Sequence, residues 1–185
     1  LISKNDAILR IDPSSLDTLL HPTLDEKSSP QVIASGLPAS PGAASGKVVF
    51  TSEQAEKLND MMQDTILVRV ETSPEDIQGM HAAKGILTAR GGMTSHAAVV
   101  ARGMGRPCVS GSSEIEIDYQ NKIFKTKNNE IKEGDLITID GSTGRIIKGE
   151  VKTVKPEISG DFSKLMSWAD KFRKLKIRTN SETPL

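Results

Sequence analysis

The order in which short apolar runs and helical segments follow one another constrains the fold of this chain most strongly. In the first part of the globular region, strand-like apolar runs are separated by segments of helical character. The apolar runs cover residues 46–50, 65–70, 85–89 and 107–111, and the helical segments begin at Ser52, Ser73 and either Thr94 or Ser95. Each of these hydroxyl residues is suited to cap a helix, and Pro74 stands at the first helical position after its cap.

Beyond residue 111 the pattern changes from alternation to consecutive strands. Residues 114–126 form a predicted hairpin that turns around Tyr119–Asn121, and residues 136–149 form a second one with its turn near Asp140–Gly144. Alternating strands and helices followed by consecutive strands predict an α/β layer with an appended all-β portion. We therefore expect the α/β fold class.

Composition narrows the classes of function. The 185 residues include 24 Lys and Arg against 24 Asp and Glu, so a nucleic-acid partner, which requires a basic surplus, is not expected. The apolar stretches are too short to cross a bilayer, so no membrane span is expected either. The single cysteine, Cys108, excludes a disulfide within the chain and favours a reducing, cytoplasmic compartment. We expect Cys108 itself to be a small core residue.

A linker-like stretch precedes the predicted globular domain, which covers residues 33–155. Residues 21–31 contain two prolines and almost no apolar side chains, which is typical of a linker. Just before them, residues 12–22 suggest a short capped helical turn. Residues 1–32 are therefore predicted to be the link from a preceding domain.

The last part of the chain, residues 156–185, combines a second linker with a predicted helix over 161–178. Four apolar residues recur there at helical spacing, and the opposite face is basic. The apolar residues are Leu165, Trp168, Phe172 and Leu175. A membrane surface or a partner's groove can accept such a helix, but docking on a neighbouring domain is the preferred interpretation.

Residues 85–111 carry the groups best suited to chemistry. An apolar strand runs into the adjacent Gly91 and Gly92, which permit a positive φ and a close approach between backbone and ligand. A helix follows, and the N–H groups and dipole at its start favour an anion. They disfavour the protonated form of His96 in the first turn, so its imidazole is expected to be neutral and nucleophilic. The same groups would stabilise a phosphoryl group on a ring nitrogen.

Other interpretations of this segment stay open from the residues alone. His96 shares a helical face with apolar residues such as Val99, which suits a half-buried structural histidine equally well. No metal site is predicted, because His21 and His81 lack ligand spacing to His96. The adjacent glycines match neither a P-loop nor a dinucleotide fingerprint, and no nucleophile elbow supports a hydrolase. Residues 71–76 are interpreted as structural, although they can border the site.

The run from residue 91 to 102 resembles the phosphohistidine signature of the phosphoenolpyruvate-utilising enzymes. That signature is two glycines, any residue, a hydroxyl residue, any residue, a histidine, two small residues, two aliphatic residues, a small residue and an arginine. The chain fills it with Gly91, Gly92, Thr94, His96, Ala97, Ala98, Val99, Val100, Ala101 and Arg102. The longer segment LTARGGMTSHAAVVARGMGRPCVSG is similar to the dikinase branch of the family, since other branches usually have Arg where Met93 stands. The match extends from about Gly36 through the hairpins.

This resemblance implies a swivelling domain of β/β/α type. Such a domain carries phosphate between an ATP-grasp nucleotide domain and a barrel that binds pyruvate or phosphoenolpyruvate, both in the same parent chain. His96 is implied as the residue that is first pyrophosphorylated and then left as phosphohistidine. The net reaction interconverts ATP, phosphate and pyruvate with AMP, diphosphate and phosphoenolpyruvate. The resemblance also implies Mg²⁺ for the full enzyme, no cofactor bound by this domain, a homodimeric parent, and a cytoplasmic or, in a plant, chloroplast location.

The same resemblance implies roles for the residues around His96. The predicted supports of the phosphate site are Gly91, Gly92, Thr94 and Ser95. Thr94 aligns with a threonine that regulatory kinases phosphorylate in plant enzymes, although a helix-cap role is the simpler interpretation. Arg90 and Arg102 are candidates for a phosphate contact or an interdomain pairing. Two alternatives are kept: the equivalent domain of phosphoenolpyruvate synthase, and a non-catalytic docking module with a buried histidine.

Overall fold

A computed structural model describes residues 2–12, 16, 20–25, 30–154 and 160–176 of the chain. The chain forms two compact units. One comprises residues His21–Pro156, and the other combines Leu1–Leu20 with Glu157–Leu185. Each is described by itself.

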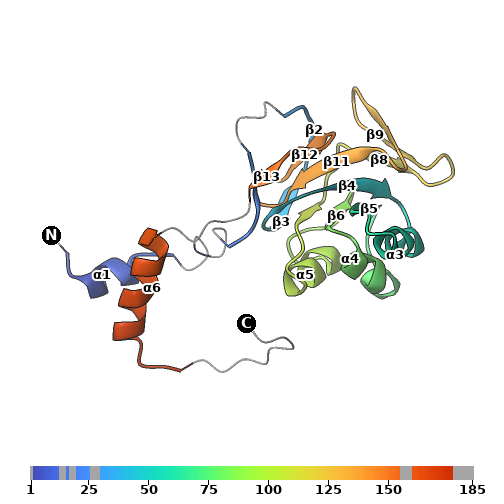
Figure 1. Ribbon diagram of the computed structural model, residues 1–185. Helices are drawn as coiled ribbons and strands as arrows, with labels where there is room; N and C mark the ends of the chain where they lie inside the picture. The colour runs from blue at the N-terminus through green and yellow to red at the C-terminus, as the bar shows by residue number, and fades with distance from the viewer. Residues whose placement is uncertain (1, 13–15, 17–19, 26–29, 155–159, 177–185) are drawn as a thin grey trace. The chain divides into compact units, whose positions relative to one another are not determined.

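The centre of the larger unit is an eight-stranded mixed sheet (Figure 1). Its strands, in spatial order, are β2 (Val32–Ser35), β12 (Arg145–Lys148), β11 (Leu136–Asp140), β4 (Ala43–Val49), β5 (Thr65–Arg69), β6 (Gly85–Thr88), β7 (Cys108–Ser110) and β3 (Leu37–Ser40). The four strands from β4 to β7 run parallel, and the flanking pairs are antiparallel. The parallel order follows from the alternation of strands and helices in the sequence, because each parallel connection needs a crossover.

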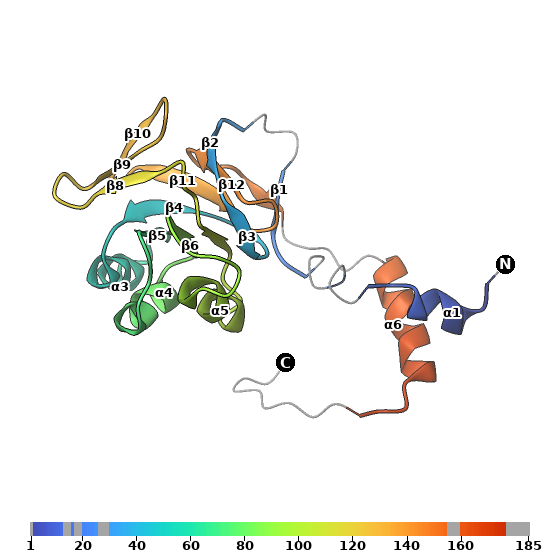
Figure 2. The same cartoon turned by 180° about the vertical axis from the view of Figure 1, so that it is seen from behind.

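Helices cover one face of this sheet, as Figures 1 and 2 show from opposite sides. They are α3 (Ser52–Asp60), the short 3₁₀ helix η1 (Pro74–Asp76), α4 (Ile77–Ala82) and α5 (His96–Gly103). A buried cluster joins these helices to the strands, and its contributions from α5 are three alanines. Ala97, Ala98 and Ala101 are buried, and their small side chains let α5 lie close to the sheet, as the sequence suggests.

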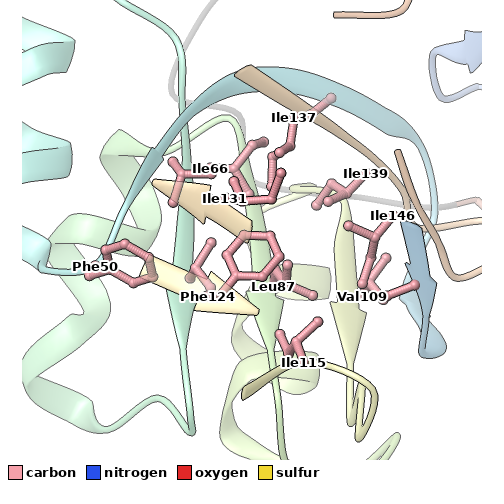
Figure 3. Close-up of a cluster of buried hydrophobic side chains, with 14 residues drawn as sticks. Phe50, Ile66, Leu87, Val109, Ile115, Phe124, Ile131, Ile137, Ile139 and Ile146 are labelled. Carbon is pink, nitrogen blue, oxygen red and sulfur yellow. The ribbon is translucent and has the colours of Figure 1, made fainter. Parts of the chain in front are cut away.

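A second, smaller sheet covers the opposite face. It consists of β8 (Glu116–Asp118), β9 (Ile123–Lys125) and β10 (Glu130–Lys132), all antiparallel. Phe124 and Ile131 from this sheet pack with Ile66 and Leu87 of the large one (Figure 3). The three layers confirm the predicted α/β class and its β/β/α arrangement. The hairpin predicted over 114–126 is present, but β10 was not expected.

The larger unit begins at His21, whereas the composition predicts a domain start at residue 33. The reason is a two-stranded pairing between β1 (Thr23–Leu24) and β13 (Thr153–Val154). Leu24 is buried with Val151 and two residues of the large sheet. A stretch with linker composition therefore forms part of the packed unit.

The observed helix caps match the predicted ones at two helix starts and differ at a third. Ser73 caps η1 with Pro74 following it, and Ser95 caps α5. The cap of α3, however, is Thr51 and not Ser52. Thr51 has the extended backbone of a cap and accepts a hydrogen bond from the Gln54 N–H, while the hydroxyl of Ser52 donates to Asp76 at 2.8 Å.

In the described residues of the smaller unit, helix α1 (Lys4–Leu9) contacts helix α6 (Gly160–Phe172). The Lys4 ammonium lies 5.2 Å from the centroid of the Trp168 ring. The predicted terminal helix is thus present but ends at Phe172, and the turn predicted over residues 12–22 falls largely outside the described residues. In the part of the chain that the structure describes, no helix is long and apolar enough to cross a membrane.

Candidate functional site

The residues singled out by the sequence gather where the parallel strands end at their carboxyl ends. There β6 leads through a glycine turn into α5, and His96 is the first residue of that helix. Ser95 has an extended backbone, its side-chain oxygen accepts the Ala98 N–H at 3.4 Å, and its own N–H donates to the Gly92 carbonyl at 3.0 Å. These bonds fix the start of α5 directly before the histidine.

Close backbone packing explains the glycine at position 91. Gly91 has a φ of +113°, and its carbonyl oxygen lies against Gly111, where an added Cβ would come within 2.3 Å of that oxygen. A side chain at either position would therefore disturb the turn. Gly92 differs, because an added Cβ there would meet no described atom within 4 Å. The space beside Gly92 leaves room for a ligand next to the helix start.

A threonine from a neighbouring loop holds the imidazole of His96. The Thr72 hydroxyl lies 2.9 Å from Nδ1 of His96, in the loop that follows β5. His96 itself is half-buried, not enclosed. Thr72 thus borders His96, an arrangement that the sequence leaves open for residues 71–76. The adjacency of β5 and β6 was the available signal, because loops after neighbouring parallel strands meet at one edge of the sheet.

A chain of hydrogen-bonded hydroxyl groups lies next to the same turn. The Ser110 hydroxyl lies 3.3 Å from that of Ser95 and 3.1 Å from that of Thr88. Thr88 and Ser110 have no exposed surface. This chain joins the ends of β6 and β7 to the cap of α5, and sequence reasoning did not find Thr88 or Ser110.

The remaining predicted residues lie around the turn in different settings. Thr94 is exposed two positions before His96, and Arg90 is exposed while its backbone N–H donates to the Val70 carbonyl at 2.9 Å. Arg102 donates from Nε to the Ala98 carbonyl at 3.1 Å and from Nη2 to the Met93 carbonyl. The guanidinium of Arg102 thus ties the last turn of α5 to the loop ahead of His96, a role additional to the two predicted for it.

The electrostatic setting favours an anion at the helix start. Unpaired N–H groups of a first helical turn and the dipole of α5 both point there. Cys108 is fully buried in the core, as predicted, and burial raises the pKa of its thiol to about 12 against the lowering effect of Arg102. Among the described residues, no group of three or more His, Cys, Asp or Glu side chains is placed to hold a metal ion.

The site therefore combines a histidine at a helix start with a glycine turn that is open on one side, in a three-layer domain. The family described as PEP-utilising enzyme, mobile domain, matches residues 61–144. The matched residues include the glycine turn, His96 and α5.

Over its full length the chain is similar to pyruvate, phosphate dikinases. It is 59% identical over 184 residues to that of Rhizobium meliloti and 56% identical over 186 residues to that of Clostridium symbiosum, with 100% of the chain covered in both. Identity to pyruvate, phosphate dikinase 2 of Zea mays is 53% over 186 residues. The chain spans about a fifth of the length of these relatives, 20%, 21% and 21% respectively.

Proposed function

We propose that this chain is the central phosphohistidine domain of a pyruvate, phosphate dikinase. In this role His96 carries a phosphoryl group between an ATP and phosphate site and a pyruvate or phosphoenolpyruvate site. The observation that carries the proposal is the contact between Nδ1 of His96 and the Thr72 hydroxyl at 2.9 Å. Because Nδ1 is engaged, Nε2 is the nitrogen left to accept the phosphoryl group.

The chemistry requires one tautomer of the imidazole. Nδ1–H donates to the oxygen of Thr72, and the lone pair on Nε2 attacks the phosphorus of phosphoenolpyruvate. The Nε2–P bond forms as the bond from phosphorus to the enol oxygen breaks, and the released enolate takes up a proton to become pyruvate. The reverse sequence returns the phosphoryl group to pyruvate. On the nucleotide side, His96 accepts a pyrophosphoryl group from ATP, leaving AMP, and inorganic phosphate then removes the outer phosphoryl group as diphosphate.

The start of α5 stabilises the product of this transfer. The N–H groups of its first turn and the helix dipole lie where the phosphoryl oxygens bring negative charge, and the space beside Gly92 admits them. We propose that phosphorylation of the exposed Thr94, where a kinase acts on it, opposes transfer. It would add about −1.5 to −2 charges two residues from His96.

The rest of the reaction belongs to other parts of the parent chain. We propose an ATP-grasp domain and a barrel for pyruvate or phosphoenolpyruvate as the partners, in a homodimeric parent. Mg²⁺, which phosphoryl-transfer enzymes hold against the phosphate oxygens, is proposed to bind in those domains, with no cofactor bound by this one. For location we propose the cytoplasm, or the chloroplast if the source is a plant.

The test uses the full-length parent protein with phosphoenolpyruvate and intact mass spectrometry. We expect one acid-labile phosphoryl group on the unmodified protein, none on His96→Ala, and full labelling of His81→Ala, which removes an exposed histidine of α4 as a matched control. Labelling of His96→Ala would overturn the carrier role. Dependence of sustained phosphoenolpyruvate formation on inorganic phosphate, with release of diphosphate, would separate the dikinase from the synthase, which hydrolyses ATP without forming diphosphate.

A further inference from the structure

The single tyrosine of the chain, Tyr119, lies in the turn between β8 and β9 and outside the strand-to-helix loops of the site. Its hydroxyl oxygen accepts the backbone N–H of Val70 at 2.8 Å. The ring stands edge-on to Phe50, with centroids 6.3 Å apart at 88°, and the Arg69 guanidinium lies 5.5 Å from its centroid. The small sheet thus reaches the ends of β4 and β5 through one side chain.

Val70 is the first residue after β5, beyond the pairing of that strand with β4 and with β6. The pairing of β4 with β5 ends at Val49 and Leu67, and β5 itself ends at Arg69. A backbone N–H beyond that end needs another acceptor if it is to stay out of water, and Tyr119 supplies it. On the other side, the Val70 carbonyl accepts the Arg90 N–H at 2.9 Å. Val70 is therefore fixed by two separate parts of the fold.

Thr72 follows two residues later and lies between two fixed points. On its far side, the Ser73 N–H donates to the Asp76 carboxylate at 2.9 Å. The position of the Thr72 hydroxyl, and with it the 2.9 Å contact to Nδ1 of His96, depends on how firmly Val70 and Ser73 are held. A series of contacts leads from Tyr119 through Val70 and Thr72 to the imidazole.

We infer that Tyr119 is a positioning residue for His96. By holding Val70 it keeps the Thr72 hydroxyl within hydrogen-bond reach of Nδ1, so that the ring is oriented with Nε2 free to accept the phosphoryl group. The consequence for phosphoryl transfer rests on the proposed function, but the effect on the contact between Thr72 and His96 does not. The appended β-sheet then has a part in the chemistry of the histidine in addition to its part in the core.

The test combines nitrogen NMR of the histidine rings with transfer from a small donor. Tyr119→Phe removes only the hydroxyl and keeps the ring contacts, so the fold is retained. Phosphoramidate serves as the phosphoryl donor for the 185-residue chain, since its P–N bond breaks as the Nε2–P bond forms and ammonia leaves. His21 and His81 are internal references in the same spectra. Ser45→Ala is the matched control, because it removes a hydroxyl bonded to Thr138 at 2.7 Å on other strands of the sheet.

We expect Tyr119→Phe to change the ring nitrogen shifts of His96, because the Thr72 contact with Nδ1 weakens, while His21 and His81 stay unchanged. Phosphorylation should slow about fivefold, the rate equivalent of one net hydrogen bond, and Ser45→Ala should leave both readouts unchanged. In Thr72→Val, adding Tyr119→Phe should cause no further loss, because the two act in series. Unchanged His96 shifts in Tyr119→Phe, or losses that add fully, would overturn the inference. Failure of the unsubstituted chain to accept a phosphoryl group would count against the proposed function instead.

Discussion

At the scale of single residues, the approach of two backbone segments decides which side chains the site tolerates. Gly111 and Gly105 share a φ of +64°, so both hold a conformation that a side chain disfavours. They differ in surroundings: an added Cβ would lie 2.3 Å from the Gly91 carbonyl oxygen at Gly111, and would meet no described atom within 4 Å at Gly105. Substitution of these two glycines therefore separates the free-energy cost of the left-handed backbone conformation from that of a steric collision.

We predict that Gly105→Ala lowers the free energy of unfolding by about 1 kcal/mol, the cost of the left-handed conformation alone. Gly111→Ala should cost about 1–3 kcal/mol more, because the Gly91 turn must move away. Urea unfolding followed by circular dichroism measures both values. Phosphorylation of His96 should slow in Gly111→Ala only. Equal losses of stability in the two variants would show that the turn yields without strain.

At the scale of elements, the caps of α5 and α3 make the same kind of hydrogen bond, but only the cap of α5 stands next to His96. Ser95 accepts the Ala98 N–H at 3.4 Å at the start of α5, and Thr51 accepts the Gln54 N–H at 3.3 Å at the start of α3. Both bonds satisfy an otherwise unpaired N–H in a first helical turn. Only the first of these turns carries His96.

We predict that Ser95→Ala and Thr51→Ala each lower the free energy of unfolding by about 1 kcal/mol. Ser95→Ala should in addition slow phosphorylation of His96 about fivefold, because fraying of the first turn misplaces the N–H groups that face the phosphoryl oxygens. Urea unfolding measures the free energy of unfolding of each variant, and reaction with phosphoramidate measures the rate at which His96 is phosphorylated. If Thr51→Ala slows phosphorylation as much as Ser95→Ala, the rate follows global stability and not the cap of α5.

Elements whose formation depends on residues close together in the sequence were predictable from it. The turn and start of α5 follow from two glycines, a serine cap and a helical spacing of small residues, all within residues 91–102. The hairpin over 136–149 follows likewise from its strands and turn. β10 and the β1–β13 pairing were not predicted, because each depends on a partner strand that composition does not identify. The contact of Thr72 with His96 joins a loop residue to a helix residue 24 positions away, which spacing within one motif does not reveal.

At the scale of the whole molecule, the larger unit contains the described buried core. The residues of α1 and α6 include none that is buried, whereas β1 contributes Leu24 to a buried cluster with Ala43, Ile147 and Val151. The Ala43 N–H also donates to the Pro22 carbonyl at 2.8 Å. The segment before residue 33 therefore stabilises the larger unit, although its composition is that of a linker.

We predict that a fragment of residues 21–156 unfolds with a free energy within about 1 kcal/mol of the whole chain, because the described residues that it loses include no buried side chain. A fragment of residues 33–155 should be less stable by about 2–3 kcal/mol, since it lacks the buried Leu24 and leaves the Ala43 N–H without its acceptor. Urea unfolding of both fragments, with phosphoramidate labelling of His96 as a check of the native site, makes the comparison. Equal stability of the fragments would mean that the β1–β13 pairing does not contribute to the fold. A large loss in the 21–156 fragment would instead assign a stabilising role to the smaller unit.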